Sequence, residues 1–556
     1  MMPITVYRAR KIITMNPMQP EATHVAVCDG RILGVGAREQ LESWGRAALD
    51  ERFADKVLLP GLIEAHCHLL EGSMWDMPHL GWFDRRDPRG KLWPGLRTLD
   101  AVVDRLDAAT ATLHAQGKAP TEPLFAWGFD PIYFGSERMT VKHLDRASRT
   151  NPIVILHANL HVMNVNSAML QAAGIGPGTE AEGIVRFASG PLAGQPTGEL
   201  REAAMYLVLR TAGASLMAPM RASGVRAFAA LACMQGVTTA TDMANTLTDD
   251  TCRVLEDVLA DDAVGLRLLP AFQAFQGAHG ASQGTQRVLE LKRRNTDKLR
   301  YGLVKMMLDG SLQAFTGRVR WPGYFNGAPN GIWVTAPGQY EADFETYHRA
   351  GLSIHTHVNG DEASEAAINA IERVLTRAPR PDHRHTLHHG QMIDAPMFRR
   401  MANLGLCANL FINHLWYWGD QHFETILGPD RALRLDACGS ALAAGVPLAI
   451  HSDAPVTPLG PLFTAWCAVN RITPKGRVLG ASERISVAQA LHAITLGAAH
   501  TLKLDHEIGS IECGKRADFC VLEDDPLQVE PMMLKDVRIW GTGLSGLWHE
   551  AAALRV

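Results

Sequence analysis

The chain has 556 residues, of which 47% are hydrophobic and 20% are charged, enough for two or three domains with large buried cores. Its 54 Lys and Arg residues nearly balance its 58 Asp and Glu residues, and these charges are scattered, which argues against nucleic acid or a membrane surface as a partner. Nine cysteines without a Cys-x-x-Cys spacing argue against a disulfide framework and against a structural zinc site.

The N-terminal segment predicts β structure rather than a targeting signal. Residues 1–20 lack the apolar core of a signal peptide, and no later apolar run reaches the roughly 18 residues of a membrane span. Together with the scattered cysteines, this pattern predicts a protein of the reducing cytoplasm, and secretion by a route without such a signal is the alternative. Residues 5–15 and 25–35 predict short strands, and an Asp29-Gly30 hairpin turn divides the second of these segments. Residues 509–522 repeat this pattern of a turn followed by a strand.

Two histidines, His66 and His68, stand at the end of the apolar run 57–65. Strand alternation points both imidazoles to one side, where they can bind one metal ion. A single His-x-His in a chain with 23 histidines can also arise by chance. The metal interpretation therefore depends on the motifs that follow.

The segment from about Glu71 to Leu209 is far longer than one strand-to-helix connection needs, so it must fold as an insertion. Strand and helix patterns alternate again from Gly236 to about His500, as in a barrel of parallel strands. The carboxyl ends of barrel strands open onto one face, where residues far apart in sequence can meet. Short apolar runs in this part contain or end in metal-capable residues: Lys305, His355 and His357, His388 and His389, and His451 and Asp453.

These motifs, in this order, resemble those of the amidohydrolase superfamily, within it the branch called family 3 that includes the N-substituted formamide deformylases. Residues 60–68 resemble the strand 1 motif, and residues 304–312 resemble the strand that carries a carboxylated lysine. The segments 357–361, 389–391 and 452–456 are similar to the motifs His-x-x-Gly-Asp, His-Ala-Gln and Ser-Asp-Ala-Pro. Any one of these motifs is weak evidence, whereas five in order across the chain are highly specific.

The resemblance implies an α/β fold, a (β/α)8 TIM barrel formed by residues 59–70 and 210–501. It also implies that the two ends of the chain, residues 1–58 and 502–556, build one discontinuous β-sandwich. Two unrelated terminal hairpins are the alternative. Residues 71–209 correspond to an α/β domain that family 3 enzymes carry between strand 1 and the rest of the barrel.

For the site, the resemblance implies a binuclear centre of divalent metal ions, with zinc as the default. Such ions acidify water and polarise a substrate carbonyl. Imidazole and carboxylate ligands also accept manganese, iron or cobalt. The implied ligands are His66, His68 and Asp453 for the first ion, His357 and His389 for the second, and a carboxylated Lys305 that bridges them.

Two of these residues have ordinary alternatives. Lys305 can be a lysine paired with Asp309 rather than a carbamate. Asp453, expected as the general base and then general acid, can instead be a helix N-cap. The histidines near these motifs are misassigned ligands, partners that orient ligands, or satisfied core residues: His355, His385, His388 and His451. Strand alternation would place His355 with His357 on one side and turn His388 away from His389.

Departures from the family pattern favour an apolar or aromatic substrate. Phe315 replaces an arginine of the strand 4 motif, and residues 411–414 keep a histidine but replace Gln-Pro by Phe-Ile. Two other departures, His388 where relatives commonly have Glu and His451 where they usually have Gly, leave the substrate preference open. An aromatic core is the alternative for most aromatic clusters. The predicted substrate-binding residues are Phe315, His414, Trp416, Trp418 and, in the inserted segment, His161.

The sequence thus predicts a metal-dependent amidohydrolase that cleaves an amide, N-formyl or carbamate-type bond of a small, partly aromatic substrate through a metal-activated hydroxide. An esterase or lactonase on the same metal site is one alternative, because the same chemistry serves any acyl transfer. A catalytically silent scaffold is another, because fold alone does not prove function. A homodimer is the expected oligomeric state.

Overall fold

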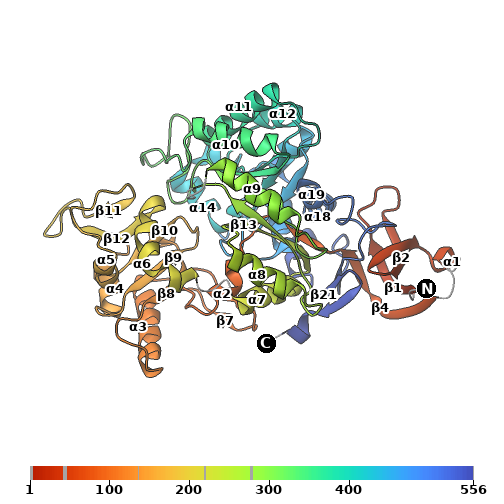
Figure 1. Cartoon of the computed structure of the whole chain (residues 1–556), viewed down its shortest axis with the longest axis horizontal. Helices are drawn as coiled ribbons and strands as arrows, with labels where there is room; N and C mark the ends of the chain where they lie inside the picture. Colours follow the sequence, from red (N-terminus) through yellow and green to blue (C-terminus); the bar gives the residue numbers. More distant parts are fainter. Residues whose placement is uncertain (1–3, 42–46, 136, 218–220, 276–279, 555–556) are drawn as a thin grey trace. The chain divides into compact units, whose positions relative to one another are not determined.

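The computed structural model of the chain describes residues 4–41, 47–135, 137–217, 221–275 and 280–554 (Figure 1). The chain divides into two compact units, one of residues 1–69 and 226–556 and the other of residues 70–225. In the described ranges, no helix is both long and apolar enough to cross a membrane.

The first unit is built on an eight-stranded sheet in which every neighbouring pair of strands is parallel. Most of these strands are buried along their whole length, as in a parallel sheet that is covered on both faces. Neighbours in the sheet follow the order of the sequence, which fits a (β/α)8-like core. The strands are β5 Leu62–Glu64, β13 Val237–Asn245, β14 Arg267–Gln273, β15 Leu303–Met307, β16 Ser353–Val358, β17 Thr386–His389, β18 Cys407–Leu410 and β19 Leu448–Ile450.

Helices follow these strands, and α9 to α12 lie in sequence order along the sheet (Figure 1). Their apolar residues recur at helical spacing: in α11, Ala367, Ile371 and Val374 are all buried. Asp394 begins α12 because its side chain accepts a hydrogen bond from the backbone N–H of Met397. The main helices of this part are α7 Ala222–Met234, α8 Asp249–Leu259, α9 Ala281–Lys292, α10 Pro337–Arg349, α11 Asp361–Arg377, α12 Ala395–Asn403, α16 Cys438–Ala443, α17 Pro461–Asn470, α18 Val487–Ala493 and α19 Leu496–Thr501.

Shorter helical turns fill several connections. The segment after β18 contains α13 His414–Tyr417, α14 Gly419–Gln421, the π-helix His422–Ile426 and α15 Pro429–Ala432. The others in this unit are α1 Arg38–Leu41 and the 3-10 turns Ala481–Glu483, Pro531–Asp536 and Ala551–Leu554.

Both ends of the chain join a second, seven-stranded sheet in the order β22-β21-β20-β4-β1-β2-β3. The long strand β4 connects them, because it runs parallel to β1 and antiparallel to β20. The Asp29-Gly30 turn between β2 and β3 is confirmed, with both residues in left-handed backbone. The two ends therefore form one sheet, and the sandwich form stays a prediction. The strands are β1 Ile4–Ile13, β2 Glu21–Cys28, β3 Arg31–Gly36, β4 Ala47–Pro60, β20 Phe519–Leu522, β21 Ile539–Leu544 and β22 Leu547–Glu550.

The second unit has a five-stranded sheet in the order β11-β12-β10-β9-β8, in which only the β8–β9 pair is parallel. Its strands contribute to two buried apolar clusters, one around Met163 and Leu200 and one around Phe129 and Ile155. The boundaries 71 and 209 of the inserted domain stay a prediction. Its elements are α2 Leu70–Met74, β6 Arg85–Arg86, β7 Leu92–Trp93, α3 Leu99–Ala115, β8 Leu124–Phe129, the 3-10 turn Pro131–Phe134, α4 Val141–Ala147, β9 Ile153–His157, β10 Val162–Val165, α5 Ser167–Ala172, β11 Ile184–Arg186, β12 Pro196–Arg201, the 3-10 turn Glu202–Ala204 and α6 Met205–Met217.

Candidate metal centre

The predicted ligands lie in the parallel strands or directly after them. β5 ends two residues before His66, and Asp453 lies in a turn after β19. The other positions are His68 after β5, Lys305 in β15, His357 in β16 and His389 at the end of β17. The fold thus gathers residues from five strands at one site.

Three ligand atoms have the spacing of metal ligands. Nε2 of His66 and Nε2 of His68 each lie 3.3 Å from Oδ1 of Asp453. Two ligands bound at 2.0–2.1 Å to one tetrahedral ion lie about 3.3–3.4 Å apart. All three ligand atoms lie within 4.8 Å of one another, so these side chains can converge on one divalent ion.

Lys305 lies beside this set, with its Nζ 3.4 Å from Nε2 of His66. Burial lowers the pKa of Lys305 to about 7, although the charge of Asp453 opposes this shift. A substantial fraction of the amine is then neutral near pH 7, and the neutral amine is the form that can react with carbon dioxide. The carboxylate of Asp309, the alternative partner of Lys305, accepts hydrogen bonds from three backbone N–H groups.

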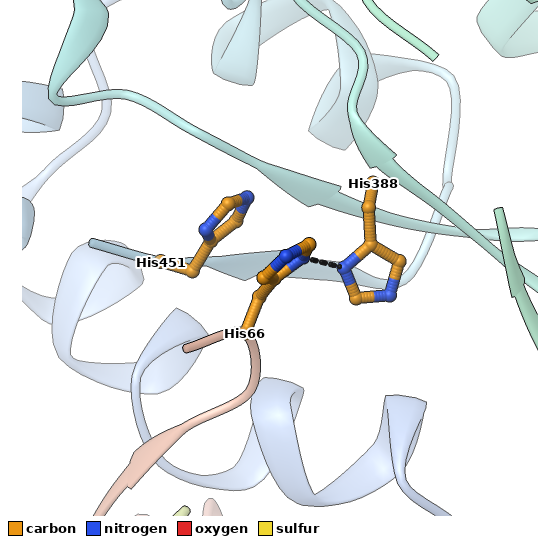
Figure 2. A group of neighbouring side chains, drawn as sticks. All are labelled: His66, His388 and His451. Atoms are coloured by element: carbon orange, nitrogen blue, oxygen red, sulfur yellow. Dashed lines mark hydrogen bonds between the residues drawn. The ribbon is translucent and has the colours of Figure 1, made fainter. Parts of the chain in front are cut away.

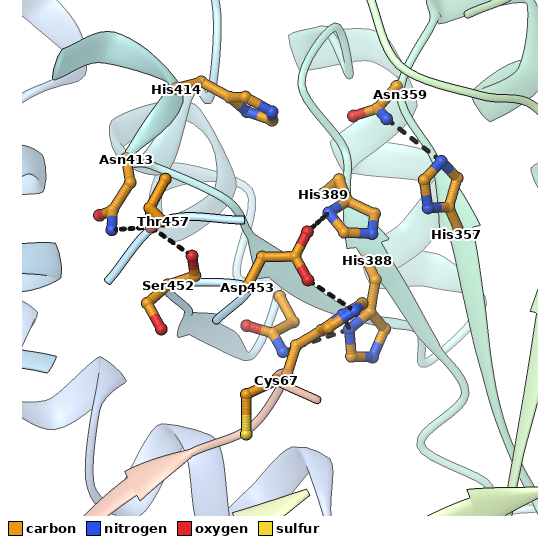
Figure 3. Close-up of polar contacts among 12 residues, drawn as sticks. Cys67, His357, Asn359, His388, His389, Asn413, His414, Ser452, Asp453 and Thr457 are labelled. Carbon is orange, nitrogen blue, oxygen red and sulfur yellow. Dashed lines mark hydrogen bonds and ion pairs between the residues drawn. The ribbon is translucent and has the colours of Figure 1, made fainter. Parts of the chain in front are cut away.

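His357 and His389 form the second pair, with ring centroids 4.3 Å apart. Nδ1 of His389 lies 3.7 Å from Oδ2 of Asp453 (Figure 3). Nε2 of His389 is buried and has no hydrogen-bond partner among the described residues. A metal ion would satisfy this nitrogen. Nε2 of His357 faces the carbonyl oxygen of Gly310 at 3.2 Å.

Asp453 does not cap a helix. The next helix, α17, begins after Gly460, and Asp453 lies in a turn closed by the Val456 N–H at 2.7 Å. Burial opposes ionisation of Asp453, but a hydrogen bond from His68 and nearby positive charges outweigh it, so its pKa lies below the usual value. The carboxylate form is thus favoured where the ligands meet.

The expectation that His388 points away from His389 is wrong. Both rings lie next to His66, with centroid distances of 4.7 Å for His388 and 4.6 Å for His389. The reason is the backbone of His389, whose φ of 64° is left-handed and ends the regular alternation of β17.

The remaining extra histidines fall into two groups. His385 belongs to a separate network, in which it contacts His348 at 2.9 Å and accepts a hydrogen bond from the backbone N–H of Ile354. His355 contacts His388, and His451 stacks on His66. Burial lowers the pKa of each of these imidazoles, so they are neutral near pH 7.

Sequence reasoning missed two buried residues that contact the site. Glu64, inside the strand 1 motif, accepts hydrogen bonds from the N–H and hydroxyl of Ser452, the residue before Asp453. Asn409 in β18 contacts His388 at 3.3 Å. A buried acid two residues before His66 was the available signal for Glu64, whereas nothing in the sequence around Asn409 marks it.

The predicted substrate-binding residues lie in different surroundings, and their role stays a prediction. The ring of Trp418 is buried against His414 and Phe411. Trp416 packs on Trp466 of α17, at a centroid distance of 5.2 Å. Phe315 packs on Tyr324 in the loop after β15. In the second unit, His161 pairs with Glu202 at 2.9 Å.

Comparison with known proteins agrees with the motifs. A model of the amidohydrolase family matches residues 54–547. The chain is 28% identical over 529 residues to the protein LONG AFTER FAR-RED 3 of Arabidopsis thaliana, covering 92% of this chain and 85% of that protein. It is 26% identical over 554 residues to the N-substituted formamide deformylase of Arthrobacter pascens, covering 96% of each.

Solved structures show the same fold. An uncharacterized metal-dependent hydrolase from Pyrococcus horikoshii OT3 superposes with a TM-score of 0.72 at 19% identity, covering 95% of this chain and 99% of that one. A second such hydrolase, from Pyrococcus furiosus, gives a TM-score of 0.68 at 18% identity and covers 94% of this chain and 100% of that one. Because the family model spans most of the chain, the predicted resemblance is confirmed and the chain belongs to the amidohydrolase family.

Proposed function

We propose that the chain is a divalent-metal-dependent hydrolase that cleaves an amide, N-formyl or carbamate-type C–N bond of a small, partly aromatic substrate. The observation that carries this proposal is the convergence of His66, His68 and Asp453 at the spacing of metal ligands. Similarity across 96% of both chains to a protein named N-substituted formamide deformylase supports the choice of bond.

The proposed metal ligands include the group of His66, His68 and Asp453 and the pair of His357 and His389. When bound, a divalent metal acidifies water and polarises the substrate carbonyl. Zinc suits the imidazole and carboxylate donors and the observed spacing. The proposed ligands are His66, His68 and Asp453 for the first ion, His357 and His389 for the second, and Lys305, as a carbamate, for both.

Asp453 is the proposed proton carrier. Its Oδ1 faces His66 and His68, whereas its Oδ2 faces His389. The carboxylate takes a proton from the attacking water as the water oxygen bonds to the carbonyl carbon. The C–N bond then breaks, and Asp453 gives this proton to the leaving nitrogen.

An apolar side chain beside the ligands supports an aromatic substrate. The ring centroid of Phe411 lies 5.9 Å from that of His389 and 4.1 Å from that of His414. Phe411 belongs to the segment in which Phe-Ile replaces Gln-Pro of the family pattern. We propose that the substrate group attached to the C–N bond lies against the ring of Phe411. Trp418 packs on Phe411 and would hold this ring in place.

The test begins with metal content. The chain purified without a chelator, and its Lys305→Ala variant, are analysed by elemental mass spectrometry. About two metal ions per chain, falling in the variant and partly restored by a small carboxylic acid, support the bridged centre. One ion that is unaffected by the change overturns the bridge, and no metal after supplementation overturns the hydrolase in favour of a silent scaffold.

The bond type is tested with the metal-loaded chain on amides, N-formyl compounds and carbamates, with esters and lactones alongside. Cleavage of C–N substrates is expected. Turnover of esters or lactones alone would favour the alternative activity. Asp453→Asn should lower kcat about 10²–10⁴-fold with an unchanged circular dichroism spectrum, since it removes the proton carrier.

A further inference from the structure

The distance between the nearest ring nitrogens of His66 and His388 shows whether these two histidines share a hydrogen bond or a metal ion. His66, His388 and His451 form a buried group (Figure 2), but Nδ1 of His66 lies only 2.6 Å from Nδ1 of His388. Two nitrogens on one tetrahedral ion lie about 3.3–3.4 Å apart. The ring of His451 stacks on that of His66 at 11°, so their in-plane lone pairs run parallel instead of converging. The contact between His66 and His388 is therefore a short hydrogen bond.

The contacts of Asn409 show whether Nδ1 of His66 or Nδ1 of His388 carries the hydrogen of the short bond. The carbonyl oxygen of Ala65 only accepts hydrogen bonds, so the atom of Asn409 that lies 3.2 Å from it is the amide nitrogen Nδ2. The same Nδ2 lies 3.3 Å from Nδ1 of His388. Because an amide nitrogen only donates, Nδ1 of His388 has no hydrogen, and its one lone pair accepts the short bond and is shared with the longer Asn409 contact. The donor in the short bond is therefore Nδ1 of His66.

This assignment fixes the other side of both rings. A neutral imidazole has one N–H, so Nε2 of His66 carries the lone pair. This nitrogen faces Oδ1 of Asp453 at 3.3 Å, and Nζ of Lys305 can donate to it from 3.4 Å. His388 has its hydrogen on Nε2 and donates it to Nδ1 of His355 at 2.7 Å.

We propose that His388 and Asn409 are positioning residues that hold His66 in the tautomer with hydrogen on Nδ1. The lone pair of His66 then lies on Nε2, where it can bind a metal ion. The ring cannot rotate without losing its hydrogen bond to His388. The proposal rests on the proposed function in one respect, since it takes His66 as a metal ligand. Hydrogen bonds of this kind set both the orientation and the basicity of a ligating imidazole.

The test compares two substitutions of nearly equal shape. His388→Leu removes the acceptor, whereas His388→Asn places an amide oxygen near the former Nδ1. Zinc affinity is measured on the metal-free chain by titration with Zn²⁺ against a chelating dye. We expect His388→Leu to bind zinc about 10–100-fold more weakly. His388→Asn should remain close to wild type, because its oxygen accepts from both His66 and Asn409.

His385→Leu is the matched control, because His385 is equally buried but contacts His348 rather than His66. Its zinc affinity should equal that of wild type. Circular dichroism of every variant confirms that the fold is kept. Equal zinc affinities for wild type, His388→Leu and His388→Asn overturn the proposal, as do equal losses in the Leu and Asn variants, because the acceptor is then irrelevant.

The tautomer is also measured directly on the wild-type chain with ¹⁵N-labelled histidine by solid-state NMR, so the test does not depend on how a variant folds. A hydrogen on Nδ1 of His66 supports the proposal, and a hydrogen on Nε2 overturns it. A wild-type chain that binds no zinc but shows the Nδ1–H tautomer refutes the proposed function and leaves the hydrogen-bond chain standing.

Discussion

Replacing Glu64 by alanine should detach the turn that carries Asp453 from strand β5. Glu64 is 1% exposed, and its two carboxyl oxygens accept hydrogen bonds from the backbone N–H of Ser452 at 3.1 Å and from the Ser452 hydroxyl at 2.8 Å. In Glu64→Ala both donors stay buried without this acceptor, at about 1–3 kcal/mol each. The variant should therefore lose about 2–6 kcal/mol of stability, and Asp453 should lose its fixed position.

The assay is urea unfolding followed by circular dichroism, together with zinc affinity and turnover of each variant. Glu64→Gln is the matched comparison, because its amide oxygen still accepts from the Ser452 N–H and its amide nitrogen can donate to the hydroxyl. Stability and zinc affinity should fall in the order wild type, Gln, Ala. If Glu64→Ala unfolds at the wild-type urea concentration and keeps full turnover, Glu64 does not hold the turn.

Two further predictions concern the scaffold. Asp518→Ala should cost about 3–5 kcal/mol in urea unfolding, because it leaves the guanidinium of Arg267 buried without its carboxylate partner; an unchanged midpoint would contradict this. Burial of Asp505 opposes ionisation, but hydrogen bonds from His500 and Arg384 outweigh it, so its pKa lies below the usual value. Its stabilising contribution is therefore full above the unfolded pKa of about 3.9 and is lost as the pH falls through the lower folded value. Asp505→Asn should flatten this part of the stability–pH curve, and an unchanged slope would show that other carboxylates dominate it.

The strand pattern of the sequence predicted much of the fold. Alternating apolar runs predicted parallel strands with metal-capable residues in them or directly after them, and β5, β15, β16, β17 and β19 bring such residues together. The Asp29-Gly30 pair predicted its hairpin, because both residues tolerate left-handed backbone. These predictions succeed because strand period and turn chemistry are local properties.

Contacts between distant segments were not predictable in this way. Glu64 and Ser452 are 388 positions apart in the chain, and neither residue type predicts a contact with the other. Trp416 and Trp418 are equally aromatic in sequence, yet Trp416 packs on Trp466 while Trp418 packs on Phe411. Local pattern gives the kind of residue at each strand end, whereas the fold decides which of them meet.

The site also depends on backbone that a regular strand does not have. A regular strand directs only alternate residues to one side, so β17 would supply either His388 or His389 to the interior. The φ of 64° at His389 breaks this rule, and Asp453 has a φ of 53°. Such conformations cost on the order of 1–3 kcal/mol at non-glycine residues and persist where surrounding bonds hold them. Next to His389, the backbone N–H of Gly390 donates a hydrogen bond to the carbonyl oxygen of Val358 at 2.8 Å. The left-handed turn lets one strand provide both a proposed ligand and the histidine that orients His66, so the density of imidazoles at this site follows from a backbone feature that the residue pattern cannot reveal.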